Sequence, residues 1–383
     1  MFIYWAMILS VTGMYSMYIT QLGFSKQDIS IIVTIYTFSS LVGQSFIGYM
    51  VDKLQNIKLV MLTTISTGII VGLAINFARL SWHFYVLLFI WGFFVAGTNS
   101  LSEAWTLNIL KAHGEQKNFG KIRGFGSIGY GFSGIVLGFL LNSFGWKLYG
   151  WYITASIILT LIIIYNINEV NPKSFDKLVI KEQISFGNAL KEIFKIKPIL
   201  MMILIMFIYS FVMKGIYSYL GILVSDYGGG AMSLGLAYFC DASPEIITFF
   251  LTATLLKKYH SKNLIFVAFL LQIVRLTVIL IFNNATAIIL MGVFSGFAFG
   301  LVAASYKTYI YEMAPQKYKA SCMSISESII AVSGVISAPI FGFIIAEFGA
   351  NSAILTGLII YGIMVLIMLK DIILPNKSMQ NKL

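Results

Sequence analysis

Charged residues are scarce in this chain of 383 residues: 11% are Asp, Glu, Lys or Arg, while 58% are hydrophobic. Soluble domains usually carry about 25% charged residues, so the composition excludes an ordinary soluble protein. Cysteine is almost absent, with only Cys240 and Cys322, both inside apolar runs and neither in a CxxC pair. This scarcity excludes a disulfide framework and a cysteine-rich zinc site.

Common motifs for nucleotide and metal chemistry are also missing. The chain has no GxxxxGKS/T phosphate loop and no HExxH zinc motif, so neither ATP hydrolysis nor zinc hydrolysis has support. Its three histidines fall in loops or at the ends of apolar runs, so any proton path through these runs must use carboxylates. We expect no metal and no cofactor. The loops are too short to hold a soluble catalytic module, and we do not expect an enzyme.

Apolar runs long enough to cross a bilayer recur from end to end. We therefore predict an all-α integral membrane protein with twelve transmembrane helices. The first run begins almost at Met1 with no basic region before it, and we interpret it as a span rather than a cleavable signal. The predicted spans cover residues 2–22, 28–50, 59–78, 83–110, 119–142, 147–168, 198–224, 232–256, 263–282, 285–313, 320–345 and 350–370.

The basic residues are distributed unevenly between the two sides. Twenty of the 26 Lys and Arg residues fall in loops on one side, three fall in loops on the other, and three lie inside spans. The positive-inside rule places the basic side and both termini in the cytoplasm. We therefore expect a multi-pass protein of the cell membrane. The net charge of +11 thus reflects orientation, and we expect no nucleic-acid partner.

One polar stretch, residues 171–197, separates six spans from six. It predicts a six-helix bundle over 1–170, a cytoplasmic linker over 171–197, and a second bundle with a short cytoplasmic tail over 198–383. An internal repeat supports this division, because residues 136–145 match 340–349 at an offset of 204 with no gap. Two bundles in the same orientation predict a pseudo-two-fold axis along the membrane normal and a binding site between the halves.

Charges at matching positions of the two halves have exchanged signs. At the offset of 204, Glu103 falls on Lys307, and Arg123 falls on Glu327. If the repeat holds in space, Lys307 and Glu327 should approach each other across the tenth and eleventh spans, with Lys214 as a competing partner for Glu327. Charges inside spans are rare, and they usually face a protein interior or a water-filled path. Two interpretations stay open for them: solute and proton chemistry, or ion pairs that hold helices together, although stability alone explains such pairs poorly. Arg123 also fits a position at the membrane interface.

Two carboxylates lie one helical turn apart in the eighth span. Asp241 and Glu245 flank Pro244, and because like charges repel, at least one of them should hold a proton near neutrality. Pro244 frees a backbone carbonyl and bends the helix, an arrangement common at transporter sites. Glu245 is the stronger candidate for carrying a proton, while Asp241 could instead be hydrated near the outer surface.

Two glycine patterns are interpreted as helix packing rather than ligand binding. Residues 124–129 fit GxGxxG, but no strand precedes them and they open a membrane span. Gly292, Gly296 and Gly300 form a GxxxGxxxG pattern in the tenth span. Small residues at these spacings let helix backbones approach closely.

Two segments resemble those of the major facilitator superfamily. Gly48-Tyr-Met-Val-Asp52-Lys53 with Lys58 resembles the loop between its second and third spans, which implies a gating role, although Gln55 and Ile57 depart from the motif. Phe119-Gly120-Lys121-Ile122-Arg123-Gly124-Phe125-Gly126-Ser127-Ile128-Gly129 is similar to the branch containing lactose permease, nucleoside:proton symporters and phenylpropionate permease. Glu103-Ala104, Glu245 and Val274-Arg275-Leu276 extend the likeness over nearly the whole chain.

The resemblance implies that Glu103 and Arg123 bind substrate, and that Glu245 and Arg275 contribute to substrate binding and proton coupling. Tyr130 stands where the sugar permease has a stacking tryptophan, which weakens a galactoside assignment. Ser295 and Ala298 stand where that permease has the histidine and glutamate of its proton relay, so the relay cannot be carried over.

We therefore expect a secondary transporter working by alternating access. The expected activity is proton-coupled symport of a small polar or aromatic organic solute, such as a sugar, a nucleoside or an aromatic acid, by a monomer in the lipid bilayer. A proton-coupled exporter is the main alternative, followed by a non-transporting receptor. The expected residues are Glu103, Arg123, Tyr130, Tyr217 and Lys307 for substrate; Asp241, Glu245, Arg275 and Glu327 for protons; Lys214 with Glu327 as a charge pair; and Gly48, Asp52, Lys53 and Lys58 for gating.

Overall fold

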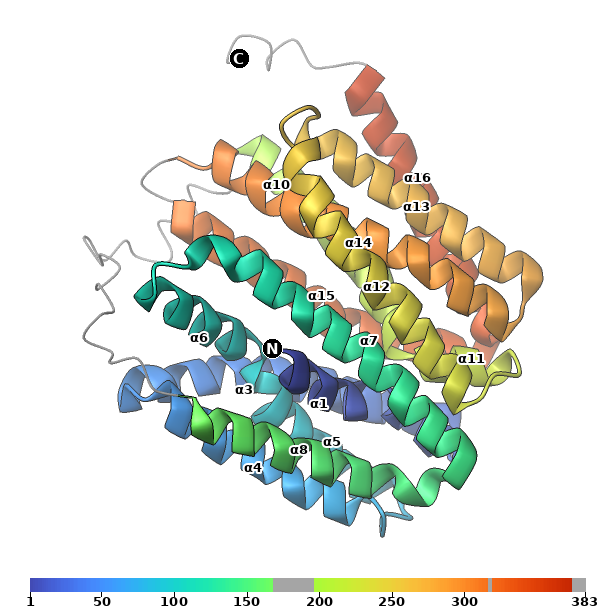
Figure 1. Ribbon diagram of the computed structural model, residues 1–383. Helices are drawn as coiled ribbons and strands as arrows, with labels where there is room; N and C mark the ends of the chain where they lie inside the picture. Colours follow the sequence, from blue (N-terminus) through green and yellow to red (C-terminus); the bar gives the residue numbers. More distant parts are fainter. Residues whose placement is uncertain (168–195, 316–318, 374–383) are drawn as a thin grey trace.

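The computed structural model describes residues 1–167, 196–315 and 319–373, and it is built of helices packed side by side (Figure 1). The linker predicted over 171–197 falls almost wholly outside these residues. The division of the chain at that linker therefore stays a prediction.

The first half of the chain forms six membrane-crossing segments. The first is broken in two and the fourth contains an irregular turn. The elements are α1 (Phe2–Thr12), α2 (Tyr15–Gln21), α3 (Lys26–Leu54), α4 (Ile57–Ala74), α5 (Ser81–Ile90), the π-helical turn η1 (Trp91–Val95), the 3-10 turn η2 (Ala96–Thr98), α6 (Asn99–Ala112), the short η3 (Gln116–Asn118), α7 (Phe119–Phe144), the short η4 (Trp146–Leu148) and α8 (Tyr149–Asn166).

The second half repeats this plan, and its first segment is broken as well. The elements are α10 (Lys197–Ser218), α11 (Leu220–Asp226), α12 (Ala231–Leu255), α13 (Ser261–Phe282), α14 (Ala285–Met313), α15 (Lys319–Phe348) and α16 (Ala350–Ile373). Eleven segments of the described chain are long and apolar enough to cross a membrane. The remaining span is α12, whose 25 residues include the carboxylates Asp241 and Glu245. The predicted twelve-helix, all-α membrane fold is confirmed.

The internal repeat reappears in the positions of the helix ends. Gly145 and Gly349 follow α7 and α15 with φ of +81° and +83°, left-handed values that favour glycine. The starts of α4 and α13, and those of α5 and α14, are likewise 204 residues apart. Both halves therefore have the same order of helices, as the sequence repeat predicts.

Among the described residues, the two halves contact each other mainly along two long helix pairs, α7 with α12 and α3 with α15, with a smaller contact between α2 and α11. In Figure 1, helices of the first half, blue to green, lie below those of the second half, yellow to red. Because α3 is the second span of the first half and α12 the second span of the other, the two contacts are related by the repeat. Any site at the centre is thus walled by both halves.

Helix α12 lies between two glycine faces that allow backbone contact. Toward α7, a Cβ added to Gly235 would lie 2.1 Å from the carbonyl oxygen of Gly134. Toward α14, a Cβ added to Gly296 would lie 2.0 Å from the carbonyl oxygen of Asp241. The GxxxGxxxG pattern therefore packs α14 against α12, as predicted. These two faces fix the position of the helix that carries both carboxylates.

The GxGxxG segment of α7 serves packing as well, in this case against α1. A Cβ on Gly129 would lie 2.1 Å from the carbonyl oxygen of Phe2, and one on Gly126 would lie 2.5 Å from Cδ1 of Trp5. The glycines therefore let α1 approach α7 closely, and the packing interpretation is confirmed.

We predict that Gly296→Ala destabilises the protein, because its new methyl group meets a backbone atom that cannot rotate away. Overpacking of this kind costs about 1–3 kcal/mol. Gly362→Ala is the matched control, since Gly362 lies in helix α16 with no atom within 4 Å of the added Cβ. Thermal unfolding of the purified variants in detergent measures the difference. Equal melting temperatures for the two variants would contradict the account.

Candidate functional site

A cavity of about 320 Å³ lies between the two halves. Its wall combines α1, α2, α3, α6 and α7 with α10, α12 and α14. Five of the residues predicted for substrate or protons line it: Arg123, Tyr130, Tyr217, Asp241 and Glu245. Other lining residues are Trp5, Ile8, Thr12, Tyr15, Tyr36, Asn99, Gly126, Ser127, Met213, Ser218, Ala242 and Phe299.

Arg123 is held from two sides at the cavity wall. Its Nε donates to Oε1 of Glu103 at 2.6 Å, which joins α7 to α6. Its guanidinium carbon lies 4.5 Å from the ring centre of Trp5, within the range of a cation–π contact. Glu103 lies behind Arg123 and does not line the cavity. Arg123 therefore lines the cavity from near the start of α7.

The irregular turn in the fourth span leads directly into α6. The π-helical turn η1 and the 3-10 turn η2 come just before Asn99. The hydroxyl of Tyr4 donates to Oδ1 of Asn99 at 2.9 Å and contacts Oγ1 of Thr98 at 2.8 Å. Tyr4 thus fixes the start of α6, the helix that presents Asn99 to the cavity and Glu103 to Arg123. Such π-helical turns often occur at functional sites.

Glu245 makes a polar contact across the two halves. The hydroxyl of Ser127 in α7 donates to Oε2 of Glu245 in α12 at 2.6 Å. A hydrogen bond to an ionised carboxylate is roughly twice as strong as one between neutral groups. The bond joins a hydroxyl donor of the first half to a carboxylate acceptor of the second.

Asp241 is buried, with 8% of its surface exposed, and its Oδ1 has no hydrogen-bond partner. This burial differs from the hydrated position that the sequence left open. Arg275 lies deeper within the second half, where its Nη1 donates to Oε1 of Gln272 at 3.2 Å. Arg275 does not line the cavity.

Aromatic side chains form much of the remaining wall. The hydroxyl of Tyr217 donates to the hydroxyl oxygen of Tyr130 at 3.4 Å, across the two halves. The Tyr130 ring meets those of Trp5 and Tyr238 edge to face, with centroids 6.4 and 5.8 Å apart. Such a wall suits a planar, partly apolar ligand.

Other predicted charges lie outside this cavity. Nζ of Lys307 lies 3.7 Å from Oε1 of Glu327, so the pairing suggested by the repeat is present. Nζ of Lys214 instead donates to the carbonyl oxygen of Ile330 at 3.1 Å. The side chains of Lys307 and Glu327 are 57% and 47% exposed.

The predicted gating residues lie at the C-terminal end of α3 and at the start of α4. Asp52 and Lys53 are in the last turn of α3, and both are at the surface of the described chain. Nζ of Lys58 donates to the carbonyl oxygens of Tyr165 and Ile167, at 2.7 and 2.9 Å, which fastens α4 to the end of α8. A gating role for these residues and for Gly48 stays a prediction.

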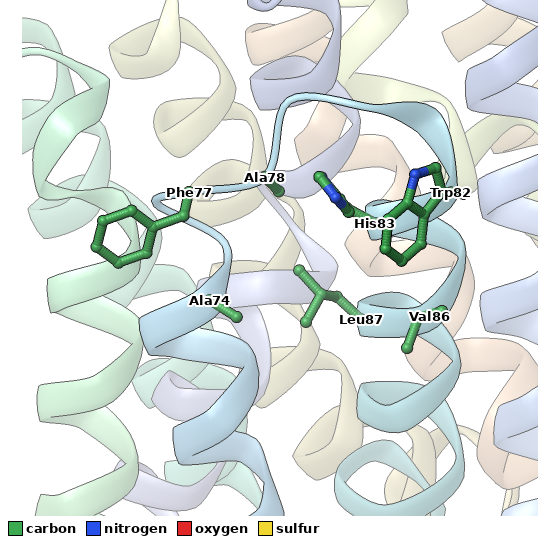
Figure 2. A pocket seen from close by; sticks show the side chains of 7 residues that line it. All are labelled: Ala74, Phe77, Ala78, Trp82, His83, Val86 and Leu87. Atoms are coloured by element: carbon green, nitrogen blue, oxygen red, sulfur yellow. The ribbon is translucent and has the colours of Figure 1, made fainter.

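A second hollow of about 320 Å³ lies at the connection between α4 and α5 (Figure 2). Phe77 lies on one side of it, and Trp82 and His83 lie on the other. Nδ1 of His83 accepts hydrogen bonds from the backbone N–H groups of Arg79 and Leu80, at 3.1 and 3.3 Å. His83 thus stabilises this connection, and no carboxylate lines the hollow.

Sequence reasoning missed Trp5, Asn99 and Ser127 as wall residues. Ser127 follows Arg123 by one helical turn, which puts both on the same face of α7 and could have identified it. Trp5 and Asn99 had no comparable signal, because their contacts depend on how α1 and α6 pack against α7.

The comparison with protein families decides the classification. The model of the MFS_1 like family matches residues 1–356. The chain belongs to this family. A comparison with curated proteins found no match.

Solved structures of transporters share the fold of this MFS_1 like protein. A point mutant of nucleoside transporter NupG superposes with a TM-score of 0.82 at 13% identity, covering 96% of each chain. Nucleoside transporter NupG itself gives 0.80 at 15% identity over 97% of this chain and 96% of that one. A D-xylose-proton symporter gives 0.69 at 14% identity over 96% and 94%. The fold is that of the major facilitator superfamily transporters, as the sequence resemblance implies.

Proposed function

We propose that this protein is a proton-coupled symporter for a small neutral organic solute that carries an aromatic ring and several hydroxyl or amide groups. The observation that supports this most is a single cavity between the halves that holds Arg123, paired with Glu103, and also Glu245. A solute site and an ionisable carboxylate in one space allow the occupancy of one to depend on the protonation of the other.

The charges around the cavity favour a neutral solute over an aromatic acid. Asp241 and Glu245 line the wall, whereas Arg123 is its cation and is already paired with Glu103. A solute carboxylate would add negative charge beside two carboxylates, and like charges in a site of low dielectric constant repel strongly. Hydroxyl and amide groups instead match the acceptors of Asp241 and the donors of Arg123.

The aromatic wall favours a ring-bearing solute over a simple sugar. Trp5, Tyr15, Tyr36, Tyr130, Tyr217 and Phe299 all line the cavity. Two of the similar structures are of a nucleoside transporter, and a third is of a proton symporter for D-xylose. Nucleosides are therefore the first solutes to test, and D-xylose is the comparison.

We further propose that the protein works as a monomer by alternating access, with both termini in the cytoplasm. In this orientation the start of α3 faces outward, and there Nζ of Lys26 contacts Oδ2 of Asp226 at 2.6 Å. Beside this ion pair, the Gln27 side chain donates to Oε1 of Glu347 at 3.3 Å. Both contacts join the two halves, which favours a conformation closed on the outer side.

We predict that Arg123→Ala lowers solute affinity at least tenfold, because a charge-assisted hydrogen bond contributes about 1.5–3 kcal/mol. Thermal-shift titration of purified protein with a nucleoside panel, followed by uptake into proteoliposomes, measures the effect. Arg79→Ala, at the connection between α4 and α5, is the control and should bind as the wild type does. Wild-type affinity in Arg123→Ala would exclude this residue from the solute site.

We predict that Glu245→Gln keeps solute exchange but loses accumulation driven by a pH gradient, because the amide cannot take up and release the proton. Counterflow and gradient-driven uptake in proteoliposomes separate the two activities. If Glu245→Gln still accumulates solute, another carboxylate carries the proton, and Asp241→Asn is the next variant. Solute driven outward by an inward proton gradient would indicate the exporter instead.

A further inference from the structure

The seam between α7 and α12 is built from small residues at regular helical spacing. Along α7, the positions that meet α12 are three or four residues apart, and most of them are glycine: Gly124, Ser127, Gly131, Gly134 and Gly138. Their partners on α12 are Ile246, Glu245, Ala242, Gly235 and Ala231 in the same order. Within this sequence of contacts, Ser127 with Glu245 is the pair of polar side chains.

The repeat shows that such packing does not require a polar pair. The related seam joins α3 to α15, and the position 204 residues after Ser127 is Ala331 in α15. That seam therefore has no hydroxyl at the position matching Ser127. Only the α7–α12 interface has a hydroxyl at this position, so helix packing alone does not explain the Ser127–Glu245 hydrogen bond.

The bond also has a distinct place among the polar contacts between the halves. Five others between described residues lie closer to the end of the bundle where α3 and α12 begin. They are Lys26 with Asp226, Gln27 with Glu347, Ser30 with Tyr219, Gly13 with Tyr238, and Tyr130 with Tyr217. Of these six contacts, Ser127 with Glu245 lies deepest toward the opposite end, and its acceptor is an ionisable group at the cavity wall.

We infer that Ser127 is a positioning residue for proton coupling. Its hydroxyl donates a hydrogen bond to the ionised Glu245 carboxylate and so joins the two halves, and this bond weakens when Glu245 takes up a proton. This inference rests on the proposed function. An ionised carboxylate accepts the hydroxyl proton strongly, and a neutral carboxyl accepts it about half as strongly. Proton binding at Glu245 thus loosens α7 from α12 beside the solute cavity.

The charged groups around Glu245 support this assignment. On its own helix, Asp241 lies one turn away and repels the ionised form. From α7, Arg123 attracts it, although Arg123 is held by Glu103 and Trp5. From α14, the wall residue is Phe299, which has no charge. The Ser127 hydroxyl is the group that bonds directly to the carboxylate, so its removal should change when Glu245 takes up a proton.

The test is the pH profile of nucleoside uptake by proteoliposomes containing Ser127→Ala. Without the donor, the ionised carboxylate is less favoured and Glu245 binds its proton at a higher pH. The pH of half-maximal uptake should therefore rise by about one unit. Ser127→Thr should restore the wild-type midpoint because it restores the hydroxyl. Ser133→Ala is the control on the same helix, since Ser133 bonds to Ala6 and Tyr152 within its own half.

The outcomes separate this inference from the function on which it rests. If wild-type uptake does not depend on pH, or if Glu245→Gln remains proton-driven, the proposed coupling through Glu245 fails. If both behave as proposed but Ser127→Ala keeps the wild-type midpoint, the role of Ser127 is overturned alone. An equal shift in Ser127→Ala, Ser127→Thr and Ser133→Ala would indicate a packing effect and would also overturn it.

Discussion

Close backbone contact on both sides of α12 is the constraint on which the centre of this protein depends. Gly235 of α12 faces α7 and Gly296 of α14 faces α12, and a methyl group at either would overlap a carbonyl oxygen of the neighbouring helix. Because a helix held in this way cannot rotate freely, its two carboxylates have fixed directions. Asp241 and Glu245 therefore lie at the cavity wall. Charged side chains inside a membrane are costly unless they face such a cavity or the protein interior.

The same contact joins the carboxylates to the first half of the chain. Arg123 and Ser127 lie one turn apart on α7, and Glu245 of α12 bonds to the second of them. Trp5 and Glu103 hold Arg123 in place from α1 and α6. Solute contacts and proton chemistry thus share one interface, so a change at either can alter how the halves meet.

The sequence predicted the fold well because its signals are local or periodic. Apolar runs identified the spans. An ungapped repeat suggested two related halves, and Gly145 and Gly349 end the matching helices α7 and α15 with similar φ values. It also suggested the pairing of Lys307 with Glu327. The cavity wall was harder to predict, because a lone Trp5 or Ser127 gains its partner only when helices far apart in sequence pack together. The half-exposed position of Lys307 depends likewise on helix orientation, which depth along a span cannot give.

The central claim is that solute and proton move together through the cavity beside Glu245, and proton movement can be observed directly. Proteoliposomes holding a pH-sensitive dye are given a nucleoside with no imposed gradient. The account predicts that the lumen acidifies as solute enters through the wild-type protein, and that Glu245→Gln exchanges solute without acidification. Solute entry through the wild-type protein with no change in luminal pH would contradict it.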